Sequence, residues 1–172
     1  MTQQQQYKTV PLYGGAITAT LPAALADAST LRPVPDTQEV WVSTTKDSNL
    51  SVIIDLLECV PGSTLHEVLT AHMDEVMRLS GASNASIVGT DSDMTSIIKS
   101  VTEGVTLCGI RIFTFMDGRG VCASTALGVL RLEPALATDV LVSVNGGTTE
   151  DMRKVCAEVL RSLRIEDKTL FQ

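Results

Sequence analysis

Few side chains in the sequence have the types and spacing that catalysis or metal binding requires. The cysteines stand at positions 59, 108, 122 and 156. They form no C-x-x-C pair, so neither a zinc site nor a dithiol redox centre is indicated. All four fall in apolar segments, and we interpret them as small buried hydrophobic residues. The two histidines fall on one predicted helix, and we expect His72 at the edge of the core and His66 in solvent.

Nucleotide-binding and hydrolase motifs are absent from the sequence. It contains no G-x-x-x-x-G-K-[ST], G-x-G-x-x-G or G-x-S-x-G pattern. We therefore predict a protein that is not an enzyme and that uses no cofactor and no metal. The chemistry left open is a dyad in which Cys59 or Cys108 meets a histidine in space.

Two other polar features have simpler interpretations than a binding site. Gly146-Gly147 precedes a predicted helix, where an anion can bind, but Glu150 and Asp151 in the first turn would repel phosphate. These acidic side chains suit the positive end of the helix dipole instead. The Asp91-x-Asp93 pair lacks the glycine of an EF-hand loop and is predicted to form a polar turn.

One acidic pair stands in a segment that proline makes stiff. Pro33 and Pro35 restrict the backbone, and Asp36 follows them in a predicted turn. Asp36 and Glu39 are three residues apart, a spacing that places both carboxylates on one side of a turn-like segment. Two interpretations stay open at this point. Either the pair forms a contact site for a basic protein surface, or Asp36 caps the turn and Glu39 is simply solvated.

The elements that must position these residues are mostly strands. Apolar runs predict strands over residues 18–22, 40–42, 50–60, 85–88, 105–116, 121–132 and 139–145. The run over 50–60 is apolar on both faces, which indicates that both faces of the sheet are covered. Asp117-Gly-Arg-Gly120 predicts a hairpin, so the sheet should be mainly antiparallel.

Two amphipathic helices are predicted to cover the sheet. Thr64-Leu-His-Glu67 is a capping box, and the apolar stripe after it ends at Gly81. A second stripe begins at Thr148 or Thr149, and a short helix followed by a turn is expected within 23–36. Together the elements predict an α+β fold, a three-layer α/β/α sandwich with a mainly antiparallel sheet and helices on both faces.

Length and charge indicate the domain organisation and the partners. The 172 residues suit a flexible N-terminus over residues 1–9 and a single domain over 10–172. With 44% hydrophobic residues and a net charge of -7, the composition is that of a folded protein that binds neither nucleic acid nor a membrane. No apolar run approaches the ~20 residues that span a bilayer, and the first residues do not form a signal peptide. We expect a cytoplasmic or nuclear protein.

The segment that contains the acidic pair resembles a known family. Its matching residues are Gly14, Gly15, Ala16, Pro22, Asp27, Ser29, Leu31, Arg32, Val34, Pro35, Asp36, Gln38, Glu39 and Val40. Leu130-Arg-Leu132, Thr138-Asp139 and an aliphatic strand ending at Asn145 provide a second match. On these residues the chain resembles the Ran guanine nucleotide release factor family, the Mog proteins. It departs from the family pattern at Arg111, where a glutamine is usual, and at Gly146-Gly147, where an acidic residue and a proline are usual.

The resemblance implies a fold, a function and a partner. The implied fold is the Mog/PsbP-like sandwich, and the implied function is a monomeric Ran GTPase-binding regulator of nucleocytoplasmic transport that promotes guanine nucleotide release from Ran. It also implies that Asp36 and Glu39 bind Ran, with Gln38 and Arg32 either supporting the same patch or serving the structure. We expect the protein in the nucleus and also in the cytoplasm. The alternative function is a non-Ran protein-binding or trafficking adaptor on the same fold.

Overall fold

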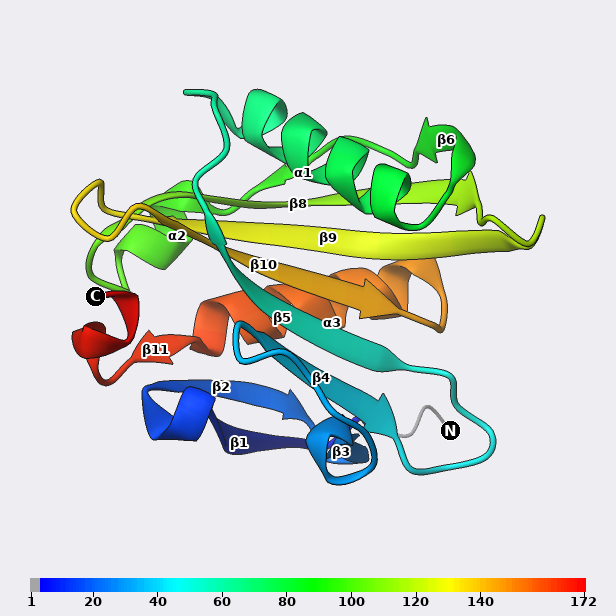
Figure 1. Cartoon of the computed structure of the whole chain (residues 1–172), viewed down its shortest axis with the longest axis horizontal. Helices are drawn as coiled ribbons and strands as arrows, with labels where there is room; N and C mark the ends of the chain where they lie inside the picture. Colours follow the sequence, from blue (N-terminus) through cyan, green and yellow to red (C-terminus); the bar gives the residue numbers. More distant parts are fainter. Residues whose placement is uncertain (1–3) are drawn as a thin grey trace.

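Two antiparallel sheets carry the fold in the computed structural model, which describes residues 4–172 (Figure 1). The larger sheet has the order β3-β4-β5-β10-β9-β8-β6, with β7 paired to β8. Its strands are β3 (Leu25–Asp27), β4 (Gln38–Ser43), β5 (Ser51–Glu58), β6 (Ser83–Ile87), β7 (Ser92–Asp93), β8 (Val105–Met116), β9 (Cys122–Leu132) and β10 (Thr138–Asn145). The smaller sheet has the order β1-β2-β11, with β1 (Tyr7–Leu12), β2 (Ile17–Pro22) and β11 (Arg164–Ile165).

Helices cover both faces of the larger sheet. The α-helices are α1 (Leu65–Leu79), α2 (Thr95–Lys99) and α3 (Thr149–Ser162). The chain also forms three short 3-10 helices, η1 (Tyr13–Gly15), η2 (Ala28–Thr30) and η3 (Lys168–Phe171). Helix α1 packs on β8 and β9, and α3 packs on β9 and β10 from the opposite face. The small sheet lies against the outer side of α3 through β2. The smaller sheet thus buries the side of α3 that the larger sheet leaves uncovered.

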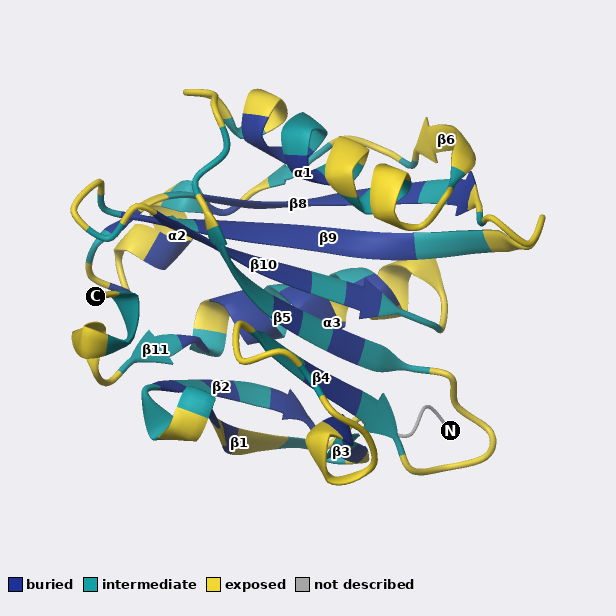
Figure 2. Cartoon of the chain, viewed as in Figure 1, coloured by how far each residue is buried: buried dark blue, intermediate teal, exposed yellow. Residues whose placement is uncertain are grey.

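Strand alternation divides the apolar residues between two cores. The core under α1 consists of Val68, Leu69, Phe113, Phe115, Leu127, Val129 and Leu141. The alternate residues of the same strands, among them Ile112, Leu130 and Val142, face α3 and belong to the larger core. Because successive side chains point to opposite faces, a strand buried on both sides is apolar at most positions. Figure 2 shows β9 and β10 buried along most of their length.

Capping boxes fix the N-termini of both long helices; the first was predicted from the sequence and the second was not. In α1, the Thr64 hydroxyl accepts the Glu67 N–H at 3.2 Å and the Glu67 carboxylate accepts the Thr64 N–H at 3.1 Å. The equivalent pair at α3 is Thr148 and Asp151. Each box satisfies backbone N–H groups that the first helical turn leaves without partners.

The predicted α+β sandwich, mainly antiparallel with helices on both faces, is confirmed, while several local predictions are wrong. Residues 7–9 of the terminus that we predicted to be flexible belong to β1, and residues 1–3 lie outside the described residues. The short helix predicted within 23–36 is only a three-residue 3-10 helix, and the segment also holds strand β3, which was not predicted. Cys122 is exposed, because it lies where β9 leaves the hairpin. The assignment of residues 10–172 to a single domain stays a prediction.

Helix α3 crosses the sheet closely at a glycine. A Cβ added at Gly128 would lie 2.7 Å from the Cys156 Sγ atom and 2.9 Å from the Leu160 Cδ1 atom. Both neighbours belong to fully buried residues of α3. The absence of a side chain at Gly128 therefore sets the distance between helix and sheet.

Gly128→Ala should lower the free energy of unfolding by about 1–3 kcal/mol, because the added methyl group overpacks the contact between β9 and α3. Urea denaturation measures the change. Adding Cys156→Ala, which removes the nearest atom, should recover part of the loss. Full stability of the Gly128→Ala variant would show that the helix does not approach the strand this closely.

Candidate functional site

A pocket of about 360 Å³ opens beside β4, near the edge of the larger sheet that β3 forms. Three carboxylates line it, those of Asp27, Asp36 and Glu39, together with Gln38 and Tyr13. We call this site the acidic pocket. Its walls come from η1, from η2 and the loop before β4, from β4 itself and from Leu170 of η3. Segments from both ends of the chain therefore meet here.

Glu39 is the most constrained carboxylate of the acidic pocket. Its Oε1 atom accepts the backbone N–H of Tyr13 at 2.6 Å. Burial raises the pKa of the Glu39 carboxyl, and the hydrogen bond from Tyr13 opposes that rise. The side chain is thus partly removed from water while its charge is held by one main-chain donor, an arrangement that favours a cation as an additional partner.

Tyr13 fixes the wall of the pocket opposite β4. Its hydroxyl has one proton to donate, and the carbonyl oxygens of Ile54, at 2.9 Å, and Thr37, at 3.1 Å, share it. Its backbone has a φ of +50°, which is uncommon for a residue with a side chain. The main-chain hydrogen bond to Glu39 and the shared hydrogen bond of the hydroxyl therefore tie η1 to strands β4 and β5.

Asp36 lies at the mouth of the acidic pocket and is exposed. The turn around it closes through the Gln38 N–H, which donates to the Pro35 carbonyl at 3.0 Å. Within residues 4–172 no hydrogen bond joins the Asp36 carboxylate to the backbone, so Asp36 does not cap its turn. Asp27 caps the neighbouring turn η2, where its Oδ1 atom accepts the Ser29 N–H at 2.8 Å.

The remaining two residues predicted for the site differ in position. Gln38 donates through Nε2 to the Oδ1 atom of Asp55 at 2.8 Å, across strands β4 and β5. Burial raises the pKa of Asp55, and the amide of Gln38 opposes that rise. Arg32 lies outside the lining of the pocket, exposed in the preceding loop. Three of the four predicted residues are therefore together in the pocket, and Arg32 is not.

Sequence reasoning did not assign Tyr13, Asp27 or Leu170 to the site. Asp27 had a usable local signal, since an aspartate two residues before a serine in a turn is typical of a side chain that caps its own backbone. Tyr13 and Leu170 had none, because only the tertiary fold brings η1 and η3 to strand β4.

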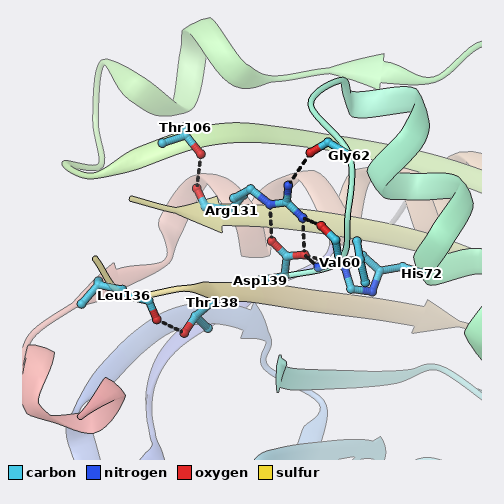
Figure 3. A network of polar contacts seen from close by, with 8 residues as sticks. All are labelled: Val60, Gly62, His72, Thr106, Arg131, Leu136, Thr138 and Asp139. Atoms are coloured by element: carbon cyan, nitrogen blue, oxygen red, sulfur yellow. Dashed lines mark hydrogen bonds and ion pairs between the residues drawn. The ribbon is translucent and has the colours of Figure 1, made fainter. Parts of the chain in front are cut away.

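A second polar cluster, which shares no residue with the acidic pocket, lies within the fold (Figure 3). Asp139 of β10 is fully buried and receives two hydrogen bonds from Arg131 of β9, at 2.7 and 2.8 Å. His72 of α1, also buried, lies with Nε2 at 2.8 Å from the Asp139 Oδ2 atom. Since an ionised carboxylate only accepts, the Nε2 atom carries the proton. Arg131 also donates to the carbonyl oxygens of Val60 and Gly62.

This cluster holds one charge in place. Burial alone would raise the pKa of Asp139, but the hydrogen bonds from Arg131 and His72 outweigh it and hold that pKa well below its usual range. His72 was predicted at the edge of the core, and the structure places it inside. Its hydrogen bond connects α1 to the middle of the sheet.

The cysteine–histidine dyad left open by the sequence is not formed among the described residues. His72 is engaged by Asp139. Burial raises the pKa of the Cys59 thiol, and burial raises that of Cys108 to about 12. Raised values disfavour the thiolate that acts as the nucleophile. Within residues 4–172 no group of three or more His, Cys, Asp or Glu side chains is arranged to hold a metal ion.

Arg111, which departs from the family pattern, is a buried anchor. Its guanidinium donates to both carboxylate oxygens of Asp91, at 3.0 and 2.8 Å, and to the Thr70 hydroxyl at 2.9 Å. It also donates to the Nδ1 atom of His66 at 3.1 Å. Asp91, predicted to form a simple polar turn, therefore joins its loop to β8 and to α1.

The pocket beside Gly146-Gly147, of about 730 Å³, is larger than the acidic pocket. It is a poorer candidate for a binding site. The carboxylate of Asp151 there belongs to the capping box of α3. The capping box therefore already satisfies N–H groups at the N-terminus of that helix, where the sequence predicted that acidic side chains would repel an anion. In the part of the chain that the structure describes, no helix is long and apolar enough to cross a membrane.

Comparison with known sequences identifies relatives of one kind. The family model described as "Ran-interacting Mog1 protein" matches residues 10–147. The chain is 29% identical to the nuclear import protein MOG1 of Saccharomyces cerevisiae, over 95% of this chain and 84% of that protein. It is 44% identical to the Ran guanine nucleotide release factor of Bos taurus over 66 residues, 38% of this chain and 34% of that protein.

Solved structures agree with the sequence comparison. The Ran-binding protein Mog1p of Saccharomyces cerevisiae has a TM-score of 0.80 at 28% identity, over 98% of this chain and 100% of that chain. The PsbP protein of the cyanobacterium Synechocystis has a TM-score of 0.58 at 12% identity, over 95% of both chains, which supports the fold alone.

Arg131→Met should destabilise the protein by about 3–5 kcal/mol, because it leaves the buried Asp139 carboxylate without its main partner. Chemical denaturation at neutral pH measures the loss. The matched control is Arg78→Met, which removes an exposed ion pair with Glu75 and should leave stability almost unchanged. Equal effects of the two substitutions would contradict the role given to the cluster.

The same cluster predicts a pH dependence. The pKa of Asp139 is lower in the folded than in the unfolded protein, so the stability it contributes is present above the unfolded value of about 3.9. That contribution is lost as the pH falls further toward the folded pKa. The free energy of unfolding, measured from neutral pH downward, should therefore decline in acid less steeply in Arg131→Met than in the parent.

Proposed function

The chain belongs to the Ran-interacting Mog1 protein family, and we propose that it binds the GTPase Ran and promotes the release of guanine nucleotide from it. The observation that carries the proposal is the family match over residues 10–147, which spans the acidic pocket from η1 to β4. Relatives named for Ran binding and for nucleotide release support it.

We propose that the acidic pocket is the contact for Ran. Asp27, Asp36 and Glu39 place three carboxylates around one opening, which fits a lysine or arginine side chain of the partner. Glu39 would form the inner contact and Asp36 the outer one. Gln38 supports the site indirectly, because its amide holds Asp55 between β4 and β5. Arg32 lies outside the pocket, and we propose that it contacts Ran only at the periphery of the interface.

Release of nucleotide needs no covalent step by this protein. If it binds nucleotide-free Ran more tightly than nucleotide-bound Ran, linkage requires that it weaken nucleotide affinity by the same factor. We therefore propose a non-enzymatic regulator. We further propose that it acts as a monomer, in the nucleus and also in the cytoplasm, with neither nucleic acid nor membrane as a partner.

A fluorescent-nucleotide release assay tests the function directly. Adding the protein to Ran loaded with a fluorescent guanine nucleotide should accelerate release of that nucleotide. The release rate should reach a plateau once all of the Ran is bound by the protein. An unrelated acidic protein of similar size is the control. Unchanged release together with no detectable complex would reject the proposal and favour an adaptor for other partners.

Glu39→Gln tests the site without disturbing the fold. The amide oxygen still accepts the Tyr13 N–H, so thermal stability should stay close to that of the parent. Loss of the charge should weaken Ran binding by about 2–5 kcal/mol if the contact is desolvated. Asp36→Asn, at the exposed mouth, should act mainly on the association rate and most strongly at low salt.

Asp74→Asn is the matched control for both substitutions. Asp74 is exposed on α1, on the other side of the molecule from β4, so its loss should leave Ran affinity nearly unchanged. Parent-like affinity of Glu39→Gln and Asp36→Asn would remove the acidic pocket from the Ran contact, even if the protein still accelerated nucleotide release.

A further inference from the structure

The loop that carries the acidic pocket also presents a large apolar side chain to solvent. Leu31 is 77% exposed. It stands between Ser29 and Val34, both of which line the acidic pocket. A single exposed leucine is ordinary on a protein surface and needs no explanation by itself. Two further observations distinguish this one, the rigidity of its loop and the charge beside it.

Hydrogen bonds hold Leu31 in its exposed position. The Leu31 and Arg32 N–H groups both donate to the Ala28 carbonyl, at 2.9 and 3.1 Å. The Thr30 hydroxyl donates to the Asp27 carbonyl at 2.9 Å, and the Asp27 carboxylate caps the turn. Ala28 itself is buried and attaches the turn to the core.

Proline limits the freedom of the rest of the loop. Pro33 and Pro35 fix the backbone just after Leu31, and the Pro35 carbonyl closes the turn into β4. A side chain on such a loop is already in place before a partner arrives. Preorganisation of this kind reduces the ordering entropy that association would otherwise lose.

Resting on the proposed Ran contact, we propose that Leu31 is the apolar anchor of that interface. Leu31 inserts into an apolar depression on Ran, while the acidic pocket beside it receives a basic side chain. Charge complementarity identifies the occupant, because three carboxylates next to the leucine select a surface on which a cation borders an apolar patch. The carboxylates fix the register and speed association, and burial of the leucine slows dissociation.

Leu79 provides a matched control. It is the same residue type with a similar exposure, 71%, but it lies at the C-terminal end of α1, on the other side of the molecule from β3 and β4 (Figure 1). The proposal predicts that the two leucines differ in their effect on Ran binding and agree in their small effect on folding.

The test is to measure the affinity for Ran of the full chain and of Leu31→Ala, Leu31→Gln, Leu31→Met and Leu79→Ala, together with their melting temperatures. Leu31→Ala and Leu31→Gln should weaken binding about tenfold or more, because the buried apolar contact is lost. Leu31→Met, which keeps an apolar side chain of similar volume, should stay within about threefold of the parent. Leu79→Ala should bind like the parent.

The dependence of Ran affinity on salt distinguishes the apolar contribution of Leu31 from the contribution of the carboxylates. The fold-loss for Leu31→Ala should be the same at about 0.05 M and about 0.5 M salt, whereas the loss for Asp36→Asn should shrink as salt screens the exposed carboxylate.

Each outcome decides between the two proposals. If Leu31→Ala and Leu31→Gln bind like the parent while Glu39→Gln loses affinity, the anchor is wrong and the Ran contact stands. If Leu79→Ala weakens binding as much as Leu31→Ala, the anchor is also wrong. If the parent itself does not bind Ran, the proposed function fails, and the anchor fails with it. If Leu31→Ala lowers the melting temperature, the Ran affinities of Leu31→Gln and Leu31→Met test the anchor in its place.

Discussion

The central strands of the larger sheet are buried on both faces, and this constraint decides where the protein can place a charge. Helix α1 covers one face of β8 and β9, and α3 covers the other, so a carboxylate there has no access to water. Asp139 is tolerated in β10 only because Arg131, His72 and the Val60 N–H all contact it. Within the sheet, carboxylates that are free to meet a partner must lie near an edge, and β3 and β4 provide that edge.

Three carboxylates of one chemistry therefore have three different environments. Asp139 is fully buried, and its pKa is lowered because the cluster around it outweighs burial. Glu39 is partly buried with a single backbone donor, and its pKa is raised because burial dominates. Asp36 is exposed and lies in solvent. Since charges attract more strongly where water is partly excluded, a cation gains more beside Glu39 than beside Asp36. The pocket thus combines an outer charge that attracts with an inner charge that binds.

Sequence reasoning predicted the parts that depend on local pattern and failed where distant segments meet. The covered sheet, the capping box of α1 and the grouping of Asp36, Gln38 and Glu39 follow from periodicity, spacing and a family resemblance. Tyr13 and Leu170 could not be assigned to the pocket, because no local rule relates η1 and η3 to β4. The same holds for His72, whose partner Asp139 lies on a strand remote in sequence. The exposed position of Cys122 depends on where the hairpin ends, and apolar runs define such boundaries poorly.

The arrangement of the acidic pocket bears on how a regulator without catalytic groups can act. Binding that orders a loop spends part of its free energy on that ordering, and only the remainder can lower the affinity of a partner for its own ligand. Here Tyr13 fixes one wall of the pocket to β4 and β5, Asp27 caps the turn at another, and Gln38 is held against Asp55. Each contact is made within the free protein. In the function we propose, little of the binding free energy is then needed to organise this protein, and most of it is available to favour the nucleotide-free form of Ran.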